Sequence, residues 1–521
     1  MFVRTKSSGK YIYLQIVENS WEKGKVKQRV IATLGRLDQL QMSLRVDGLI
    51  KSLARFAEKV KIIEAYREGN LEVLSVKRLG PSLTVGRLWQ ELAIDRVLKG
   101  LLTDRKYGFA LERAIYFTVL SRLFFPGSDR KALRIGRDYL IEGLEGIKLH
   151  HLYRSMHWLG QVKEEVELNL FKRNRSLFNH LNLVFFDTTS IYFTGEGGET
   201  LGRYGYSRDR RPEEKQMIVG VVMDATGRPL SCPMWPGNTA DAVALREVLQ
   251  RLKDRFGVGD MAIVADRGMV SKETISWLEA SGTGYILGTR MRREKEVLID
   301  VLGRAGRYQE VGGNLQVKEV RVEGKRYILC FNPEEAERDA LGREVLIETL
   351  RGKIQGDVKA LVGNRAFRRY LRIDKSSVEI AEEKIKAEER FDGKYVLRTN
   401  LELPSKEIAL RYKDLWQVER IFRELKEVLQ TRPVYHKYDL TIEGHVFCSF
   451  LALIVMKELM RRVNFKLEWE EIKQDLTSLY TVGVLHEGKK YLFRSPLEGS
   501  CAEVLKSLGI AIPPSVIESP T

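Results

Sequence analysis

The chain has 521 residues, of which 44% are hydrophobic and 30% are charged, so it can form about three domains with large cores and is too apolar for bulk disorder. Lysine and arginine (87) exceed aspartate and glutamate (70), which gives a net charge of +17. This charge favours a polyanionic partner, most often nucleic acid, and the alternative is a soluble basic protein without such a partner. The four cysteines lie far apart without a Cys-x-x-Cys pair, which argues against a zinc ribbon or disulfide scaffold and suits a reducing cytoplasm.

The first 180 residues divide into a predicted β-hairpin and a helical region. In residues 1–40, alternation of Tyr11, Tyr13 and Val17 predicts strands on both sides of a Lys/Gly turn, within residues 10–36. From about residue 40 to 180 the pattern becomes helical. One apolar face has the spacing i, i+3, i+4 and i+7, and it consists of Val85, Leu88, Trp89 and Leu92. Another helix is expected near 111–125, ending at Pro126–Gly127.

Residues 181–294 have the pattern of a mixed sheet. LNLVFFD predicts a first strand, and QMIVGVVMD with RPLSCPMW predicts a hairpin around Ala225–Thr226–Gly227. A helix over 241–256, the strand MAIVAD, a helix capped by Ser271 and the strand TGYILGT follow, giving the order β-β-β-α-β-α-β. Because the apolar runs suit strands buried on both faces, we expect the strand at 183–187 to be central and the strand at 261–265 to lie beside it.

The remaining segments alternate between β-rich and helical patterns. Residues 295–400 predict a β-rich block with helices at 333–350 and 381–389, and a helical region follows over 405–462, broken near Pro433. The tail, 466–521, predicts a helix, a hairpin around Gly488 and a last helix near 499–508. The first twenty residues lack the apolar core of a signal peptide, and the longest apolar run, 446–456, is too short to span a bilayer, so we expect no membrane segment and a buried helix.

Two aspartates follow apolar runs. Asp187 follows Val184–Phe185–Phe186, and Asp266 follows Ile263–Val264–Ala265. Side chains at the carboxyl ends of strands project into the crevice where open sheets place their sites. Alternatively, each acid only caps the turn that follows it.

A third acid lies in YKDLWQVERIFRELKEVLQ, which predicts one continuous helix. Tyr412, Glu419 and Lys426 are spaced by seven residues, about two helical turns, so they would share one stripe. That stripe is a poor core face. A solvated face would explain Glu419 and Lys426 but would leave Tyr412 and Trp416 needlessly exposed.

Three carboxylates are the ligands that a pair of hard cations requires. Mg²⁺ or Mn²⁺ prefers oxygen ligands, with water and phosphate completing its coordination. Two such ions about 3.5–4 Å apart activate a water or a 3′-hydroxyl and stabilise the leaving oxygen of an in-line phosphoryl transfer. We therefore expect Asp187, Asp266 and Glu419 to be both the metal ligands and the catalytic residues, with Glu424 and Glu427 as the next candidates for the third ligand.

The ordered motifs resemble those of the DDE transposases of bacterial insertion sequences. The resemblance is closest to the branch with a β-rich insertion and a Tyr-x2-Arg-x3-Glu-x6-Lys signature, here Tyr412, Glu419 and Lys426 with Leu415 in place of the Arg. Arg420 or Arg423 would substitute for that Arg. Further similar blocks are GYSRDRRPEEKQMIVGVVMDATGRPL, PGNTAD, ADRGMVS, FDGKYVLRTN and LKEVLQTRPVYH, so the resemblance covers roughly residues 110–460.

The resemblance implies an α/β fold with an RNase H-like catalytic core. The core would comprise residues 181–294 and 401–465, interrupted by the β-rich insertion at 295–400 and preceded by a helical DNA-binding region at 41–180, with a C-terminal tail at 466–521. It implies metal-dependent cleavage at insertion-sequence ends and strand transfer into target DNA, by a homodimer on double-stranded DNA in the bacterial or archaeal cytoplasm, associated with the nucleoid. The alternatives are an RNase H-like nuclease or resolvase without strand transfer, and a catalytically inactive DNA-binding protein derived from a transposase.

Several basic and aromatic residues are candidates for DNA contacts. Lys426 should bind phosphate, because an ammonium has donors and no lone pair for a metal. A basic stretch with interleaved aromatics would grip phosphates or stack on an unpaired base, and it comprises Tyr204, Tyr206, Arg208, Arg210, Arg211 and Lys215. Arg290, Arg292 and Arg293 would follow the DNA backbone. For both groups a solvated, non-binding surface is the alternative, and His445 is expected to be a packing residue.

Overall fold

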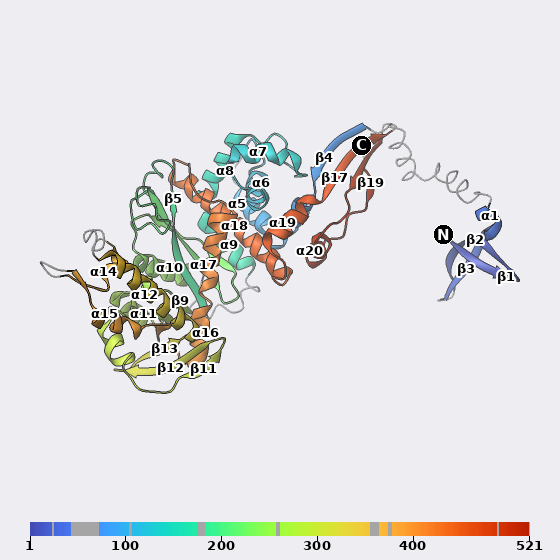
Figure 1. Ribbon diagram of the computed structural model, residues 1–521. Coiled ribbons are helices and arrows are strands. Elements are labelled where there is room, and N and C mark those ends of the chain that lie inside the picture. Colours follow the sequence, from blue (N-terminus) through green and yellow to red (C-terminus); the bar gives the residue numbers. More distant parts are fainter. Residues whose placement is uncertain are drawn as a thin grey trace. The chain divides into compact units, whose positions relative to one another are not determined.

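The computed structural model describes residues 1–22, 25–42, 72–103, 107–174, 183–256, 261–354, 364–373, 378–486 and 489–519. These residues form two compact units. The first combines Met1–Leu79 with Ser478–Gly499 and Ala511–Thr521, and the second combines Gly80–Thr477 with Ser500–Ile510. Figure 1 traces both units along the chain.

The first unit contains two antiparallel sheets. The expected hairpin is present as β2 (Tyr11–Glu22) and β3 (Lys25–Arg36), with β1 (Phe2–Ser8) added on the other side of β2 and α1 (Leu37–Met42) following. The second sheet has the order β19-β18-β17-β4 and contains β4 (Glu72–Arg78), β17 (Tyr480–His486), β18 (Lys489–Arg494) and β19 (Val516–Ser519). β17 and β18 form the hairpin expected near Gly488, which itself lies outside the described residues.

β4 corrects the expectation of helix throughout 40–180. The strand EVLSVKR pairs with β17, more than 400 residues further along the chain. Strand propensity depends strongly on such pairing partners, and no local pattern could reveal this one. The part of the predicted helical region at 43–71 lies outside the described residues.

The helical part of the second unit contains one apolar helix, α18 (Asp439–Arg462), which packs against α8 (Leu149–Gln161), α6 (Leu111–Phe124) and α4 (Gly80–Glu91). Its other helices are α5 (Ile94–Leu101), α7 (Asp129–Ile135), α9 (Lys163–Arg173), α19 (Trp469–Ser478) and α20 (Cys501–Ser507). Among the described residues, α18 is the one helix whose length and composition would suit a membrane span, yet 78% of its apolar window is buried inside the protein. The expectation of a buried helix at 446–456 is therefore confirmed.

Two glycines let α8 and α18 approach closely. A Cβ on Gly160 would lie 1.9 Å from the carbonyl oxygen of Leu440, and a Cβ on Gly444 would lie 1.8 Å from that of Met156. Real atoms never approach so closely, so any side chain at either position would push the helices apart. The pair fixes α18 against α8 (Figure 1).

The centre of the second unit is a ten-stranded sheet of order β11-β12-β13-β16-β10-β9-β5-β6-β7, with β8 also paired to β6. Its first part comprises β5 (Leu183–Tyr192), β6 (Gln216–Asp224), β7 (Pro229–Ser231), β8 (Met234–Pro236), β9 (Ala262–Ala265) and β10 (Gly284–Gly288). β5 pairs parallel with β9 and antiparallel with β6, which confirms its predicted central place beside β9. α10 (Asp241–Phe256) and α11 (Lys272–Ala280) pack their apolar residues against this part, and Ser271 caps α11 as predicted.

Four strands of the β-rich block, β11, β12, β13 and β16, continue the same sheet, whereas β14 and β15 form a separate two-stranded sheet. The block consists of β11 (Gln309–Gly312), β12 (Leu315–Val322), β13 (Lys325–Phe331), α12 (Pro333–Lys353), α14 (Arg365–Arg368), β14 (Leu371–Ile373), β15 (Val378–Ile380), α15 (Glu382–Glu389) and β16 (Lys394–Thr399), after a π-helix at Val297–Val301. β16 pairs antiparallel with both β10 and β13, so it joins the block to the core strands.

The helix predicted across residues 412–430 is broken. α16 (Ser405–Lys413) ends before Asp414, and α17 (Trp416–Arg423) leads into a π-helix at Glu424–Val428. At the break, the amides of Gln417 and Val418 bond to carbonyls only three residues back. Tyr412 and Glu419 therefore lie on different helices, and the prediction of one continuous helix was wrong. The shared stripe, which the seven-residue spacing gives only within an uninterrupted α-helix, stays a prediction.

Candidate active site

Asp187 lies in the middle of β5, not at its end as predicted. Parallel pairing between β5 and β9 stops at Phe185, opposite Val264, whereas antiparallel pairing with β6 continues past Asp187 to Tyr192. The strand continues because β6 supplies a partner for the polar residues after Asp187. The Asp187 side chain is 18% exposed, just beyond the point where β9 leaves the ladder.

Asp266 directly follows β9, as predicted, and opens a short 3-10 helix at Arg267–Met269. The Tyr412 hydroxyl, from α16, donates a hydrogen bond of 3.1 Å to Asp266 Oδ1. Burial, and then the charge of Asp266, raise the pKa of Tyr412, so its hydroxyl keeps its proton and remains a donor. A Cβ on Gly288 of β10 would lie 2.4 Å from the tyrosine oxygen, so only glycine leaves room for this contact.

A further acid, Asp241, joins Asp187. Arg208 links the two, with Nη2 2.8 Å from Asp241 Oδ2 and Nη1 3.8 Å from Asp187 Oδ1. The hydroxyl of Thr188 donates to Asp241 Oδ1 at 2.7 Å, while the amide of Thr188 donates to Asp187 Oδ1 at 2.7 Å. Sequence reasoning missed Asp241 because an acid in the first turn of a helix is ordinarily explained by the helix dipole.

These carboxylates are neighbours in space. Asp241 Oδ2 and Asp266 Oδ2 lie 3.7 and 3.8 Å from the position that a Cβ on Gly268 would take, so they are no further apart than the sum of those distances. The pKa of Asp187 is raised to about 7, chiefly by burial; Arg208 and the Thr188 amide oppose this rise, and the charges of Asp266 and Asp241 contribute to it. The site therefore favours a cation beside Asp187.

Glu419 is not gathered with these acids. Its helix α17 packs against β5, but the Glu419 side chain is exposed. Among the described residues, no three His, Cys, Asp or Glu side chains lie close enough together to hold a metal ion. Of the two fallback candidates, Glu424 is bound to Arg420 and Lys457, and Glu427 is exposed.

Lys426 makes a largely buried ion pair. Its Nζ lies 2.8 Å from Asp209 Oδ1, which also receives Arg432 Nη1 at 2.5 Å. Burial lowers the pKa of Lys426, and Asp209 opposes that effect. Because Asp209 follows Arg208 directly, this cluster anchors the loop that brings Arg208 to Asp187.

The other predicted DNA contacts are spread over the surface. Tyr206 is 82% exposed, and Arg423 is also exposed. Four arginines already have partners in the protein: Arg420 pairs with Glu424, Arg292 pairs with Glu388, Arg211 stacks over Tyr192, and Arg290 donates to the carbonyls of Arg267 and Gly268. Arg210 has a left-handed backbone (φ 58°) in the loop after Arg208. His445 is buried, as expected of a packing residue.

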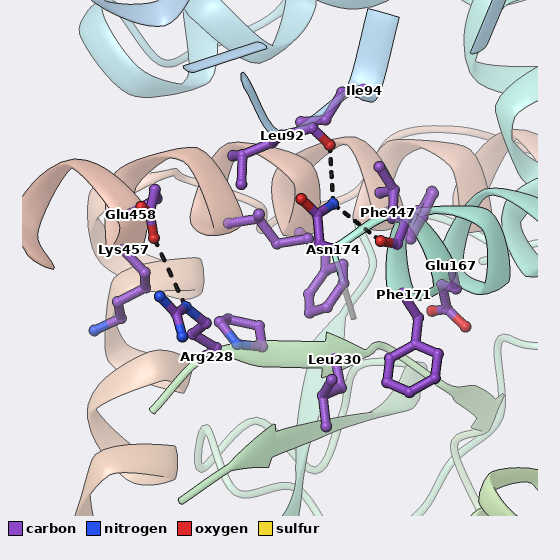
Figure 2. Close-up of a pocket in the computed structure, with 14 residues that line it drawn as sticks. Leu92, Ile94, Glu167, Phe171, Asn174, Arg228, Leu230, Phe447, Lys457 and Glu458 are labelled. Atoms are coloured by element: carbon purple, nitrogen blue, oxygen red, sulfur yellow. Dashed lines mark hydrogen bonds and ion pairs between the residues drawn. The ribbon is translucent and has the colours of Figure 1, made fainter. Parts of the chain in front are cut away.

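An apolar pocket elsewhere in the second unit contains none of the candidate acids (Figure 2). Asn174 donates to the carbonyls of Leu92 and Leu170 at one side, and Arg228 faces Glu458 at 3.7 Å at the other. Its cavity volume of about 50 Å³ has room for little more than a water molecule. It lies between α9, α18 and β7 and is not the candidate site.

Comparison with known proteins identifies the family. The model described as "Transposase DDE domain" matches residues 180–455, and "IS1634 family transposase, N-terminal domain" matches residues 2–61. The chain belongs to the DDE transposases. The α/β class, with a transposase core, a β-rich insertion and a preceding helical part, is thereby confirmed.

Other comparisons add little to that assignment. No curated protein matches the transposase. Among solved structures, it is similar to a piggyBac transposase in a synaptic complex with hairpin DNA (9% identity, 76% of each chain, TM-score 0.36). It is also similar to the Mos1 transposase in a paired-end complex with the left transposon end (15% identity, 37% of this chain and 57% of that one, TM-score 0.15). At these TM-scores the likeness carries no argument.

Proposed function

We propose that this transposase cleaves double-stranded DNA at the ends of its insertion sequence and joins those ends to target DNA, using two Mg²⁺ or Mn²⁺ ions. The observation that carries the proposal is the convergence of Asp187 and Asp266 from the adjoining parallel strands β5 and β9. Asp266 follows the end of β9, and the carboxyl ends of strands are where open α/β sheets bind their substrates.

The side chains fit divalent cations. A poorly solvated carboxylate with a pKa raised to about 7, close to two other carboxylates and to the single guanidinium of Arg208, is stabilised by added positive charge. Carboxylate oxygens are the ligands that Mg²⁺ and Mn²⁺ prefer. Asp187 and Asp266 would hold the ions, and bound ions would activate a water or 3′-hydroxyl and stabilise the leaving oxygen.

The protein's own residues prepare this site. The Tyr412 hydroxyl orients Asp266, and Thr188 with Asp241 orients Asp187. Arg208 balances the charge of Asp187 and Asp241, and it would move to a DNA phosphate once another cation neutralises these acids.

Glu419 is proposed as the third carboxylate. Its support is the family signature and the packing of α17 against β5, the strand that carries Asp187. Because no three acidic side chains among the described residues are grouped for a metal ion, we propose that Glu419 completes the site only when DNA and the ions are bound. Asp241 is the rival third ligand, and the observation that favours it is its link to Asp187 through Arg208.

The helical part of the second unit and the exposed basic residues are proposed to bind DNA, with two copies of the chain holding two ends. The net charge of +17 supports this partner. We also propose that the protein is associated with the nucleoid in a bacterial or archaeal cytoplasm, because its positive charge favours DNA.

An assay for the joining of a transposon end to target DNA distinguishes the proposed transposase activity from the alternatives. A duplex that carries a native end is incubated with a supercoiled plasmid and Mg²⁺ or Mn²⁺, and joined products are counted. The transposase joins the two DNAs, a resolvase or nuclease cuts without joining, and an inactive DNA-binding protein does neither. Ca²⁺ should support assembly with little chemistry, because its looser coordination suits an in-line displacement poorly.

The same assay identifies the third ligand. Glu419→Ala and Asp241→Ala are compared, with Asp254→Ala on the exposed side of α10 as the control. If Glu419 is the ligand, Glu419→Ala abolishes cleavage and joining and Asp241→Ala leaves a slower reaction. Full cleavage by Glu419→Ala together with an inactive Asp241→Ala would transfer the role to Asp241.

A further inference from the structure

A pair of stacked tyrosine rings links the β-rich block to the candidate active site. Tyr395 lies in β16, the strand of the block that pairs with β10 of the core. Its ring stacks on that of Tyr412, with the ring centroids 5.8 Å apart and 27° between the planes. Tyr412 in turn donates its hydroxyl to Asp266. Nothing in the proposed catalytic chemistry uses Tyr395.

The side chain of Tyr412 is confined at its hydroxyl and on one face of its ring. The hydroxyl reaches Asp266 through the space that Gly288 leaves open, since a Cβ there would lie 2.4 Å from the tyrosine oxygen. The ring of Tyr395 lies against its face. A hydrogen bond weakens steeply when donor and acceptor are misaligned. The stacked ring therefore helps to fix the direction in which the Tyr412 hydroxyl points.

Tyr395 is itself held by the strand beside it. Cys330 of β13 lies directly opposite Tyr395 in the antiparallel ladder, and its side chain is fully buried. Burial, and then the thiol of Cys330, raise the pKa of Tyr395, so its hydroxyl stays protonated. The ring that supports Tyr412 is therefore neutral and does not repel the carboxylate of Asp266.

The turn before β16 is anchored to α12, a helix of the same block. Asp392 forms a bidentate ion pair with Arg343, at 2.5 and 2.7 Å. The Gly393 amide donates to Asp339 Oδ2 at 3.0 Å, and a Cβ on this glycine would lie 2.3 Å from a backbone carbonyl oxygen. Tyr395 follows two residues later. The position of its ring is therefore set by contacts within the β-rich block.

We propose that Tyr395 is a positioning residue through which the β-rich block orients Asp266. This role rests on the proposed function in taking Asp266 as a metal ligand. The block holds Tyr395, Tyr395 holds the ring of Tyr412, and the Tyr412 hydroxyl holds one oxygen of the carboxylate. Groups that orient a ligating carboxylate are part of a metal site, and their substitution typically lowers metal affinity or activity by about 10- to 100-fold.

Single variants test the contribution of the Tyr395 ring. Tyr395→Leu removes it, Tyr395→Phe keeps it, and Tyr308→Leu is the matched control, because Tyr308 is a partly buried tyrosine of the same block that packs on Phe331. Two quantities are measured: nicking of a duplex with a native end in Mn²⁺, and the rise in melting temperature that Mn²⁺ causes without DNA. Tyr395→Leu should slow nicking about 10-fold and reduce the Mn²⁺-dependent rise. Tyr395→Phe and the control should match the wild type in both.

A double variant separates positioning from a general loss of structure. Tyr412→Phe has no hydroxyl to orient, so adding Tyr395→Leu to it should slow nicking less than about 2-fold further. A residue that only supports the fold would slow nicking by the same factor in the wild type and in Tyr412→Phe.

The role of Tyr395 would be overturned by equal slowing in both backgrounds, by full-speed nicking in Tyr395→Leu, or by an undiminished Mn²⁺-dependent rise in that variant. Each of these outcomes leaves the proposed function intact, because the wild type still nicks the end. A wild type that does not nick would instead contradict the proposed function, and the melting temperatures with Mn²⁺ would still decide the role of Tyr395.

Discussion

Replacing Asp187 by asparagine should stabilise the metal-free protein, and the gain should grow with pH. In the wild type the carboxylate is poorly solvated, and its pKa is raised from 3.8 to about 7, chiefly by burial. Above that pH the folded protein must hold a charge that is better solvated in the unfolded chain. The side-chain amide of the Asp187→Asn variant carries no charge at any pH.

The sign and size follow from linkage. Between the unfolded pKa near 4 and the folded pKa near 7, the folded wild type holds a proton on Asp187 that the unfolded chain has lost, so its stability falls as pH rises through this window. The rise in pKa corresponds to roughly 4 kcal/mol as an upper limit. We expect about 1–3 kcal/mol at pH 8, because the side chain is 18% exposed and the variant weakens a contact with Arg208.

The measurement is urea denaturation of Asp187→Asn and wild type in EDTA between pH 5 and pH 8.5, followed by circular dichroism. Asp254→Asn, an exposed acid on α10, is the control. At pH 5 the variant and the wild type should differ little, and at pH 8 the variant should unfold at higher urea. Added Mn²⁺ should stabilise the wild type and not Asp187→Asn. A difference in stability that is independent of pH would refute the reasoning.

Three further substitutions test the surroundings of the site. Tyr412→Phe removes the hydroxyl that orients Asp266, so nicking should slow about 10- to 100-fold with an unchanged melting temperature; a full-speed variant would exclude this role. Lys426→Ala leaves Asp209 with Arg432 alone, and should lower stability by about 3 kcal/mol and weaken end binding, measured by denaturation and fluorescence anisotropy. Gly160→Ala places a Cβ against the backbone of α18 and should lower the melting temperature by several degrees; an unaltered melting curve would contradict the close packing.

Local patterns predicted most elements of the core. The helix at 241–256, the Ser271 cap and the strand at 261–265 all depend on periodicity and capping within a few residues, and these are the features that sequence specifies locally. The buried strand that carries Asp187 was also predicted, but its length was not, because β6 extends it beyond the apolar run.

The remaining differences depend on distant partners. Apolar periodicity could not reveal the break near Leu415. The Leu415 side chain is buried there, and regular α-helix resumes only at Trp416. β16 lies between β10 and β13 in the sheet and pairs with both. More than sixty residues of chain separate it from either strand, so local sequence patterns could not predict this pairing. Asp241 becomes a candidate only when Arg208 and Thr188 bring it beside Asp187.

The most direct test of the central claim is nicking of a labelled duplex with a native end, measured beside binding of the same duplex. Asp187→Ala and Asp266→Ala should bind the end as the wild type does and produce no detectable nick in Mg²⁺ or Mn²⁺, because neither variant can hold both ions in line. Asp254→Ala should bind and nick normally. Wild-type nicking by Asp187→Ala or Asp266→Ala would contradict the account.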